Sequence, residues 1–138
     1  MDYKIISERY PKAFSDLEDW SLGSKFTPEE KQQLFANSLK FHVESRRLYD
    51  FFDERNLNVQ IIPEYHVNEK RWIWKIIWLK KPENRVFPVE NWTDFTNSIG
   101  IENEGALERV DAEKSAFEKA FELHERSLNG EDIDKLNS

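Results

Sequence analysis

The chain has 138 residues and a formal net charge of −7, with 14% aromatic and 34% charged residues. This length fits one domain, and the five Trp, four Tyr and ten Phe can form a core, which excludes a disordered chain. The lack of cysteine excludes disulfides, thiolate metal sites and cysteine nucleophiles. No apolar run reaches the roughly 18 residues of a membrane span, and the first residues lack a secretory signal pattern. We therefore expect a soluble cytoplasmic protein that does not enter a membrane.

The acidic residues are concentrated in the last quarter of the chain. Residues 101–138 carry eleven Asp/Glu and five Lys/Arg, whereas residues 57–100 carry five and six. The overall charge argues against nucleic-acid binding, because phosphate contacts require clustered Lys and Arg. A local basic face in the middle of the chain remains compatible with this composition.

The first part of the chain has helical patterns. Residues 11–22 carry apolar side chains at helical spacing and begin with a proline, which suits the first helical position. Thr27-Pro28-Glu29-Glu30 predicts a helix start, because Thr27 can accept from the N–H three residues on and Glu30 can reach back as a capping box. Apolar side chains at helical spacing then continue toward Asn56, which suits a C-terminal cap. It predicts either one long bent helix or two helices separated near residues 44–46.

From residue 57 the apolar period changes to two, which predicts strands. The first strand spans residues 57–67, and Pro63 places it at a sheet edge because proline lacks the N–H donor. Residues 68–70 suit a hairpin loop, and residues 71–79 are the most strand-like stretch. The apolar face of the first strand carries Leu57, Val59, Ile61, Tyr65 and Val67. The second strand carries Trp72, Trp74, Ile76 and Trp78 on one face and Arg71, Ile73, Lys75, Ile77 and Leu79 on the other.

The last part of the chain ends in a helix. Residues 86–89 suit a third short strand and residues 92–99 a helical turn. The final helix begins at Asp111 as its cap, with Ala and Phe on one face and Glu on the other, and ends at Asn129-Gly130 before a frayed tail over 129–138. This order predicts one α+β domain over residues 1–138. Its C-terminal helix packs on a two- or three-stranded antiparallel sheet.

The tryptophan stripe at 72, 74 and 78 has two interpretations. Rings spaced by two could stack nucleic-acid bases. The flanking cations Lys70, Arg71, Lys75, Lys80, Lys81 and Arg85 would then contact phosphates. The favoured interpretation is that these rings form the core face of the sheet, against Phe117 and Phe121 of the final helix.

The candidate chemical sites are weak. Asp50, Asp53 and Glu54 share a helix face, but an exposed acidic face explains them without a ligand. The histidines His42, His66 and His124 fall on three elements and form no zinc helix motif, and Glu64 with His66 is only a weak acid/base hint. With four glycines there is no phosphate loop, and no nucleophile elbow is present. We expect no enzyme, no cofactor and no metal.

Three segments carry a resemblance to a known group of proteins. They are Tyr10-Pro11-Lys12-Ala13-Phe14, the stretch Arg46-Arg47-Leu48-Tyr49-Asp50-Phe51-Phe52-Asp53, and the Ala/Phe-rich helix at 111–123. Together they comprise 26 of the 138 residues, and the chain resembles small proteins of bacteriophage and mobile-element genomes. That group carries no assigned activity, so the resemblance implies a context, an accessory protein inside a bacterial host cell, and no site residue.

A second resemblance concerns topology. The order helix, three strands and Ala-rich helix is similar to the double-stranded-RNA-binding domain, which places Lys residues at the start of its last helix. Here residues 109–114 carry two acidic and two basic side chains instead of a cluster of lysines, which argues against duplex binding.

The sequence thus favours a protein that acts through a protein–protein contact, with a host protein or with itself. Two surfaces are expected to serve it: the apolar strand face of Ile73, Ile77 and Leu79, and an acidic outer face of the last helix. The acidic face comprises Glu113, Glu118, Glu122 and Glu125. The alternative is nucleic-acid binding through the basic and aromatic strand region 70–85.

Overall fold

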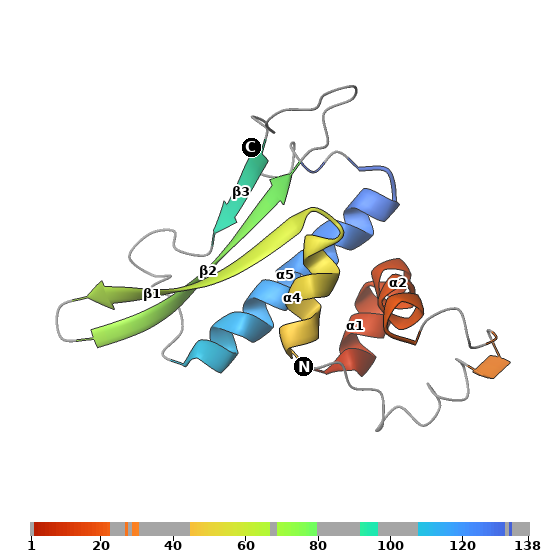
Figure 1. The fold of residues 1–138 in the computed structure, drawn as a ribbon, viewed down its shortest axis with the longest axis horizontal. Coiled ribbons are helices and arrows are strands. Elements are labelled where there is room, and N and C mark those ends of the chain that lie inside the picture. Colours follow the sequence, from red (N-terminus) through yellow and green to blue (C-terminus); the bar gives the residue numbers. More distant parts are fainter. Residues whose placement is uncertain are drawn as a thin grey trace.

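The computed structural model describes residues 2–22, 27, 29–30, 45–66, 69–79, 92–96, 108–131 and 133. The elements in chain order are α1 (Tyr3–Arg9), α2 (Pro11–Leu22), α4 (Ser45–Asp53), β1 (Leu57–His66), β2 (Glu69–Leu79), β3 (Trp92–Thr96) and α5 (Arg109–Leu128). Figure 1 shows α4 and α5 against one face of a three-stranded sheet, with α1 and α2 packed beyond them. This confirms the α+β class and the packing of the C-terminal helix on the sheet.

The N-terminal region contains one helix more than the sequence predicted. Helix α1 begins after Asp2, whose carboxylate accepts from the backbone N–H groups of Lys4 at 3.0 Å and Ile5 at 3.4 Å. Aspartate is a strong N-cap because it satisfies N–H groups that lack an intrahelical partner. Helix α2 follows within two residues and has the predicted bounds 11–22.

The predicted helix start at Thr27 is confirmed by its hydrogen bonds. The Glu30 backbone N–H donates to Thr27 Oγ1 at 3.2 Å, and the Thr27 hydroxyl donates to the Glu30 carboxylate at 3.2 Å. Residues 31–44, which decide between one helix and two, lie outside the described residues. Helix α4 ends at Asp53, and Asn56 adopts a φ of 63°, a left-handed conformation that asparagine tolerates better than most residues.

The sheet has the order β1-β2-β3 and is antiparallel throughout. Strand β1 lies at the edge, as its proline predicted. The hairpin differs from the prediction, because Glu69 pairs with His66 and already belongs to β2. The helical turn predicted over residues 92–99 is wrong for residues 92–96, which form β3 and pair with β2. The strand predicted over 86–89 lies outside the described residues.

The core lies between the sheet and the helices, with α5 at its centre. Helix α5 contacts β1 and β2 on one side and α2 and α4 on others. Its Ala112, Ala116 and Ala120 are fully buried, and their small side chains let the helix approach the sheet closely. Trp74 and Ile76 of β2 are buried and Trp78 packs against the same cluster. Trp74 and Trp78 therefore belong to a core face, as the favoured interpretation held, whereas Trp72 is half-buried and is not part of this core cluster.

Both ends of α5 differ in part from the prediction. The N-cap is Glu108, without a side-chain cap hydrogen bond, and Asp111 lies in the first turn rather than at the cap. The predicted stop at Asn129-Gly130 is confirmed, and Gly130 has a φ of 85°. The frayed tail is corrected at Ile133, which is 1% exposed and belongs to the core.

Candidate functional site

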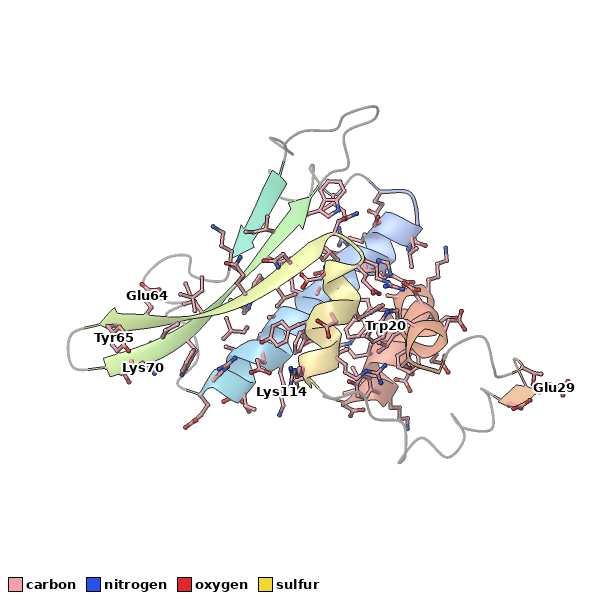
Figure 2. All side chains as sticks on the ribbon, viewed as in Figure 1. Trp20, Glu29, Glu64, Tyr65, Lys70 and Lys114 are labelled. Atoms are coloured by element: carbon pink, nitrogen blue, oxygen red, sulfur yellow. The ribbon has the colours of Figure 1, made fainter. Side chains whose placement is uncertain are left out.

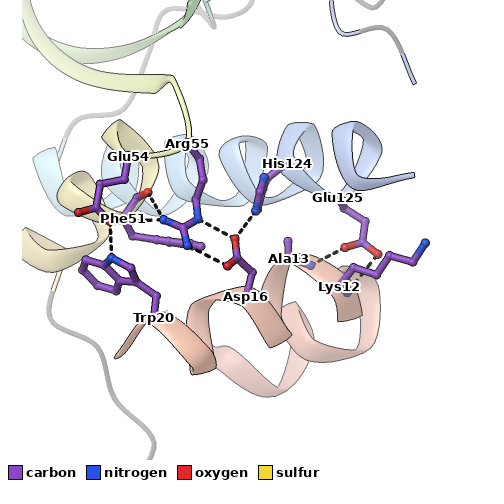
Figure 3. Close-up of polar contacts among 9 residues, drawn as sticks. All are labelled: Lys12, Ala13, Asp16, Trp20, Phe51, Glu54, Arg55, His124 and Glu125. Carbon is purple, nitrogen blue, oxygen red and sulfur yellow. Dashed lines mark hydrogen bonds and ion pairs between the residues drawn. The ribbon is translucent and has the colours of Figure 1, made fainter. Parts of the chain in front are cut away.

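A partly buried polar cluster connects three helices (Figure 3). Asp16 of α2 pairs with both ends of the Arg55 guanidinium, at 2.6 Å from Nε and 2.8 Å from Nη2. Asp16 Oδ2 also lies 2.7 Å from Nε2 of His124 on α5. The Arg55 guanidinium lies over the Phe51 ring, with 4.0 Å between Cζ and the ring centroid. The cluster therefore ties α2, the end of α4 and α5 together.

The charges of this cluster stabilise one another. The hydrogen bonds from Arg55 lower the pKa of Asp16 below its ordinary value; burial opposes this effect, and the hydrogen bond with His124 adds to it. The hydrogen bonds with Asp16 likewise raise the pKa of Arg55. A two-pronged Arg–carboxylate pair is the strongest geometry for such an interaction. Asp16 therefore stays ionised to lower pH than an ordinary aspartate, and Arg55 keeps its charge to higher pH than an ordinary arginine.

An Asp–His pair is also a component of general-base sites. The surroundings of this pair decide whether it can accept a proton from a substrate. His124 is 7% exposed and its ring stands edge-on to Phe51 at 5.8 Å between centroids. Both oxygens of Asp16 are already engaged by Arg55. Among the described residues, Asp16 is the only hydrogen-bond partner of His124. The arrangement suits a structural clamp between helices better than proton transfer to a substrate.

Glu125 has a role that the sequence did not suggest. It is 8% exposed and accepts from the backbone N–H of Ala13 at 2.7 Å and of Lys12 at 3.2 Å (Figure 3). These N–H groups belong to the first turn of α2, which follows Tyr10 and therefore has no Ser, Thr, Asp or Asn at its start. A carboxylate at this position satisfies two free donors and interacts favourably with the helix dipole. Glu125 is thus removed from the predicted outer face.

The other three residues of the predicted acidic face lie nearer the surface but are paired within the chain. Glu113 contacts Arg109 at 3.1 Å, and Glu118 contacts Arg9 at 2.8 Å. Glu122 contacts Lys119 at 2.9 Å and Arg126 at 3.5 Å. This face is therefore less negative than the sequence count of glutamates indicated.

The predicted apolar strand face is partly covered. Ile73 and Ile77 are half-buried, so they form no exposed patch, and the side chain of Leu79 lies outside the described residues. Helices α1 and α2 do not cover this face, because they pack on the same side of the sheet as α4 and α5 (Figure 1).

The basic residues of the nucleic-acid alternative do not share one face. Lys70 lies on the helix-facing side of β2, whereas Arg71 and Lys75 lie on the other side, because successive strand residues alternate. Arg71 is also paired with Glu69 at 2.9 Å. Lys80, Lys81 and Arg85 lie outside the described residues.

The carboxylates of the weaker site candidates contact different partners and do not form one site. Asp53 accepts from Asn58 at 2.9 Å, and Glu54 accepts from the Trp20 indole N–H. Within the part of the chain that the structure describes, no group of three or more carboxylate or histidine side chains is placed to bind a metal. His42 and the side chain of His66 lie outside that part, which leaves the Glu64–His66 hint and a meeting of the histidines untested.

One surface was not predicted from the sequence. Tyr65 at the end of the β1–β2 hairpin is 76% exposed, although its strand position placed it on the packed face. The hairpin extends past the start of α5, where Val110 is 60% exposed (Figure 1). The Lys70 ammonium lies 4.4 Å from the Trp72 ring centroid and 5.9 Å from that of Tyr65. The hairpin-end surface, as we name it, comprises Pro63, Tyr65, Lys70, Trp72, Arg109 and Val110.

The position of α5 explains this exposure. Its first residue, Arg109, lies over Trp72 with 5.6 Å between Cζ and the ring centroid, so the helix begins level with Trp72. None of the described helices lies over the residues nearer the hairpin turn (Figure 1). The sequence indicated this exposure only through the lengths of the elements, because the predicted first strand is longer than the final helix that packs on it.

None of the helices in the described ranges is long and apolar enough to span a membrane. No protein family, curated protein or solved structure matches the chain.

Proposed function

We propose that this protein acts without catalysis, by binding another protein through the hairpin-end surface. The observation that carries the proposal is the 76% exposure of Tyr65 beside Trp72, with Arg109 and Lys70 stacked against the tryptophan. Tyr, Trp and Arg are the residues most enriched at the centres of protein interfaces. Large exposed apolar side chains that lie together are likewise typical of contact sites.

The distribution of polar groups supports this choice over an enzymatic function. The one Asp–His pair among the described residues is held by Arg55 and buried against Phe51. The buried carboxylate of Glu125 is used by the first turn of α2. Both groups are therefore committed to holding helices together.

The cellular context follows from the resemblance of the three sequence segments to phage and mobile-element proteins. We place the protein in the cytoplasm of a bacterial host cell, as an accessory protein that contacts a host protein or a second copy of itself. An acidic chain with exposed rings suits such a role, because its negative charge limits nonspecific attachment to nucleic acid.

A photo-crosslinking experiment tests the contact site. A benzophenone analogue of phenylalanine replaces Tyr65 in one variant and Ile5 in another, since Ile5 is also exposed but lies on α1. We expect discrete protein adducts from position 65 and none from position 5 after irradiation of bacterial cells that make the variants. The adduct mass distinguishes a second copy from a host protein.

Two outcomes would contradict the proposal. Equal adduct patterns from both positions would show that the hairpin end is not a preferred contact. Adducts from position 65 that disappear on nuclease treatment would support nucleic-acid binding instead. Light scattering and the 260/280 nm ratio of the purified protein complete the test, because a persistent excess at 260 nm would also favour nucleic acid.

A further inference from the structure

We infer, resting on the proposed function, that the hairpin-end surface recognises a protein segment in which a carboxylate lies next to an apolar side chain. Lys70 binds the carboxylate, and the exposed Tyr65 ring beside it contacts the apolar side chain. The inference thus adds the chemical class of the partner to the site described above.

The Lys70 ammonium is placed to bind an anion. Its ammonium lies near two rings, Tyr65 and Trp72, and Tyr65 is its directly opposite residue on β1 (Figure 2). Among the described residues it contacts no carboxylate, so its N–H donors are free for a partner. The rings hold the flexible side chain in one region, which lowers the entropy lost when an anion binds.

The acidic residues of the hairpin do not compete for Lys70, because they lie on the opposite face. Glu69 and Arg71 share that face and pair with one another, and Glu64 is the cross-strand neighbour of Arg71. On the helix-facing side, Arg109 is already engaged by Glu113 at 3.1 Å. Among the residues that the structure describes, this surface therefore presents one uncompensated positive charge, next to the exposed Tyr65 ring.

A single free cation matches a carboxylate better than a polyanion. Nucleic acid requires several cations in one tract, and the exposed Glu108 and Asp111 lie at the start of α5, adjacent in sequence to the two α5 residues of this surface. These carboxylates would repel a run of phosphates. A protein segment with one Asp or Glu beside Leu, Phe or Tyr can place its carboxylate on Lys70 without such repulsion.

Selection from a ribosome-displayed library of random linear peptides tests this inference. The full chain is used as bait in four forms: wild type, Lys70→Glu, Tyr65→Ala and Lys4→Glu. Lys4 is an exposed lysine on α1 and serves as the matched charge control. Thermal unfolding of each form confirms that these exposed substitutions leave the fold intact.

We expect wild type and K4E to enrich peptides with Asp or Glu beside an apolar residue, and Y65A to lose them. The K70E bait should enrich Lys or Arg at the same position, because the surface then carries a negative charge where wild type carries a positive one. An acidic peptide selected by wild type should bind K70E at least tenfold more weakly, and this loss should shrink with added salt.

The outcomes separate the two levels of the proposal. Peptides that depend on Tyr65 but show no acidic preference, or the same preference with K70E, would overturn the inference and leave the contact site standing. Absence of any selected peptide that depends on Tyr65 would overturn the contact site and the inference together. Enrichment of segments of this chain itself would identify a second copy as the partner, and it supports the inference only if those segments carry the carboxylate.

Discussion

The carboxylate of Glu125 is expected to contribute more stability than any other glutamate of α5. The side chain is 8% exposed and accepts two N–H groups from the first turn of α2, at 2.7 Å and 3.2 Å. In Glu125→Ala both donors lose their acceptor inside a part of the protein with little access to water. The free energy of unfolding should therefore fall.

The magnitude follows from the contacts that are lost. A hydrogen bond to a charged group contributes about 1.5–3 kcal/mol, and loss of a helix N-cap costs about 0.5–2 kcal/mol. These two values describe the same pair of contacts and are therefore not added. We expect a loss of about 2–3 kcal/mol in the free energy of unfolding for Glu125→Ala. Glu125→Gln retains one oxygen acceptor and loses the charge near the helix dipole, so about 1–2 kcal/mol is expected.

Urea denaturation followed by circular dichroism measures these values, and thermal unfolding should show a decrease in Tm of about 10 °C for the alanine variant. Glu122→Ala is the matched control one turn along the same helix. Glu122 is paired with Lys119 and Arg126 near the surface, so its loss should cost about 0.5 kcal/mol or less. Equal losses for the two variants would refute the assignment of Glu125 as the cap of α2.

Three further predictions concern other parts of the fold. The lowered pKa of Asp16 means that its contribution is complete above the ordinary aspartate value of about 3.9 and is lost as the pH falls through the lower folded value; urea denaturation across acidic pH should therefore show a smaller decline for Asp16→Asn than for wild type. Ala116→Leu should lower stability by about 1–3 kcal/mol in thermal unfolding because it separates α5 from the sheet, whereas the exposed Ser115→Leu should be nearly neutral. Asn56→Gly should leave the urea midpoint almost unchanged, whereas Asn56→Val should cost about 1–2 kcal/mol because a branched side chain is strained at a φ of 63°; equal effects of the two would contradict the conformational argument.

Local signals in the sequence were sufficient for most elements. The change of apolar period at residue 57 marked the boundary between helices and strands, and the structure begins β1 at Leu57. Asn56 and Gly130 were predicted as helix stops, and the structure gives both a positive φ, which asparagine and glycine tolerate as single residues. The proline in β1 likewise predicted an edge strand from its own chemistry.

Contacts between distant segments explain where the sequence interpretation was wrong. Residues 92–96 are a strand because β2 provides hydrogen-bond partners for them, and a short segment cannot reveal that pairing. Helix α1 was not predicted because its seven residues are too few for a clear apolar period, and its start depends on the cap that Asp2 provides. Both cases show tertiary or cap interactions overriding a weak local pattern.

Glu125 and Tyr65 show what the sequence by itself determined and what only the tertiary structure decided. The helical and strand periods placed both side chains correctly on a face of their element, because that depends on neighbours a few residues away. Whether each face is covered depends on other elements: the partner of Glu125 lies 112 residues earlier in the chain, and Tyr65 is exposed because α5 begins level with Trp72. Burial is a property of the packed chain, so a glutamate expected at the surface became a helix cap and a tyrosine expected in the core became the candidate contact site.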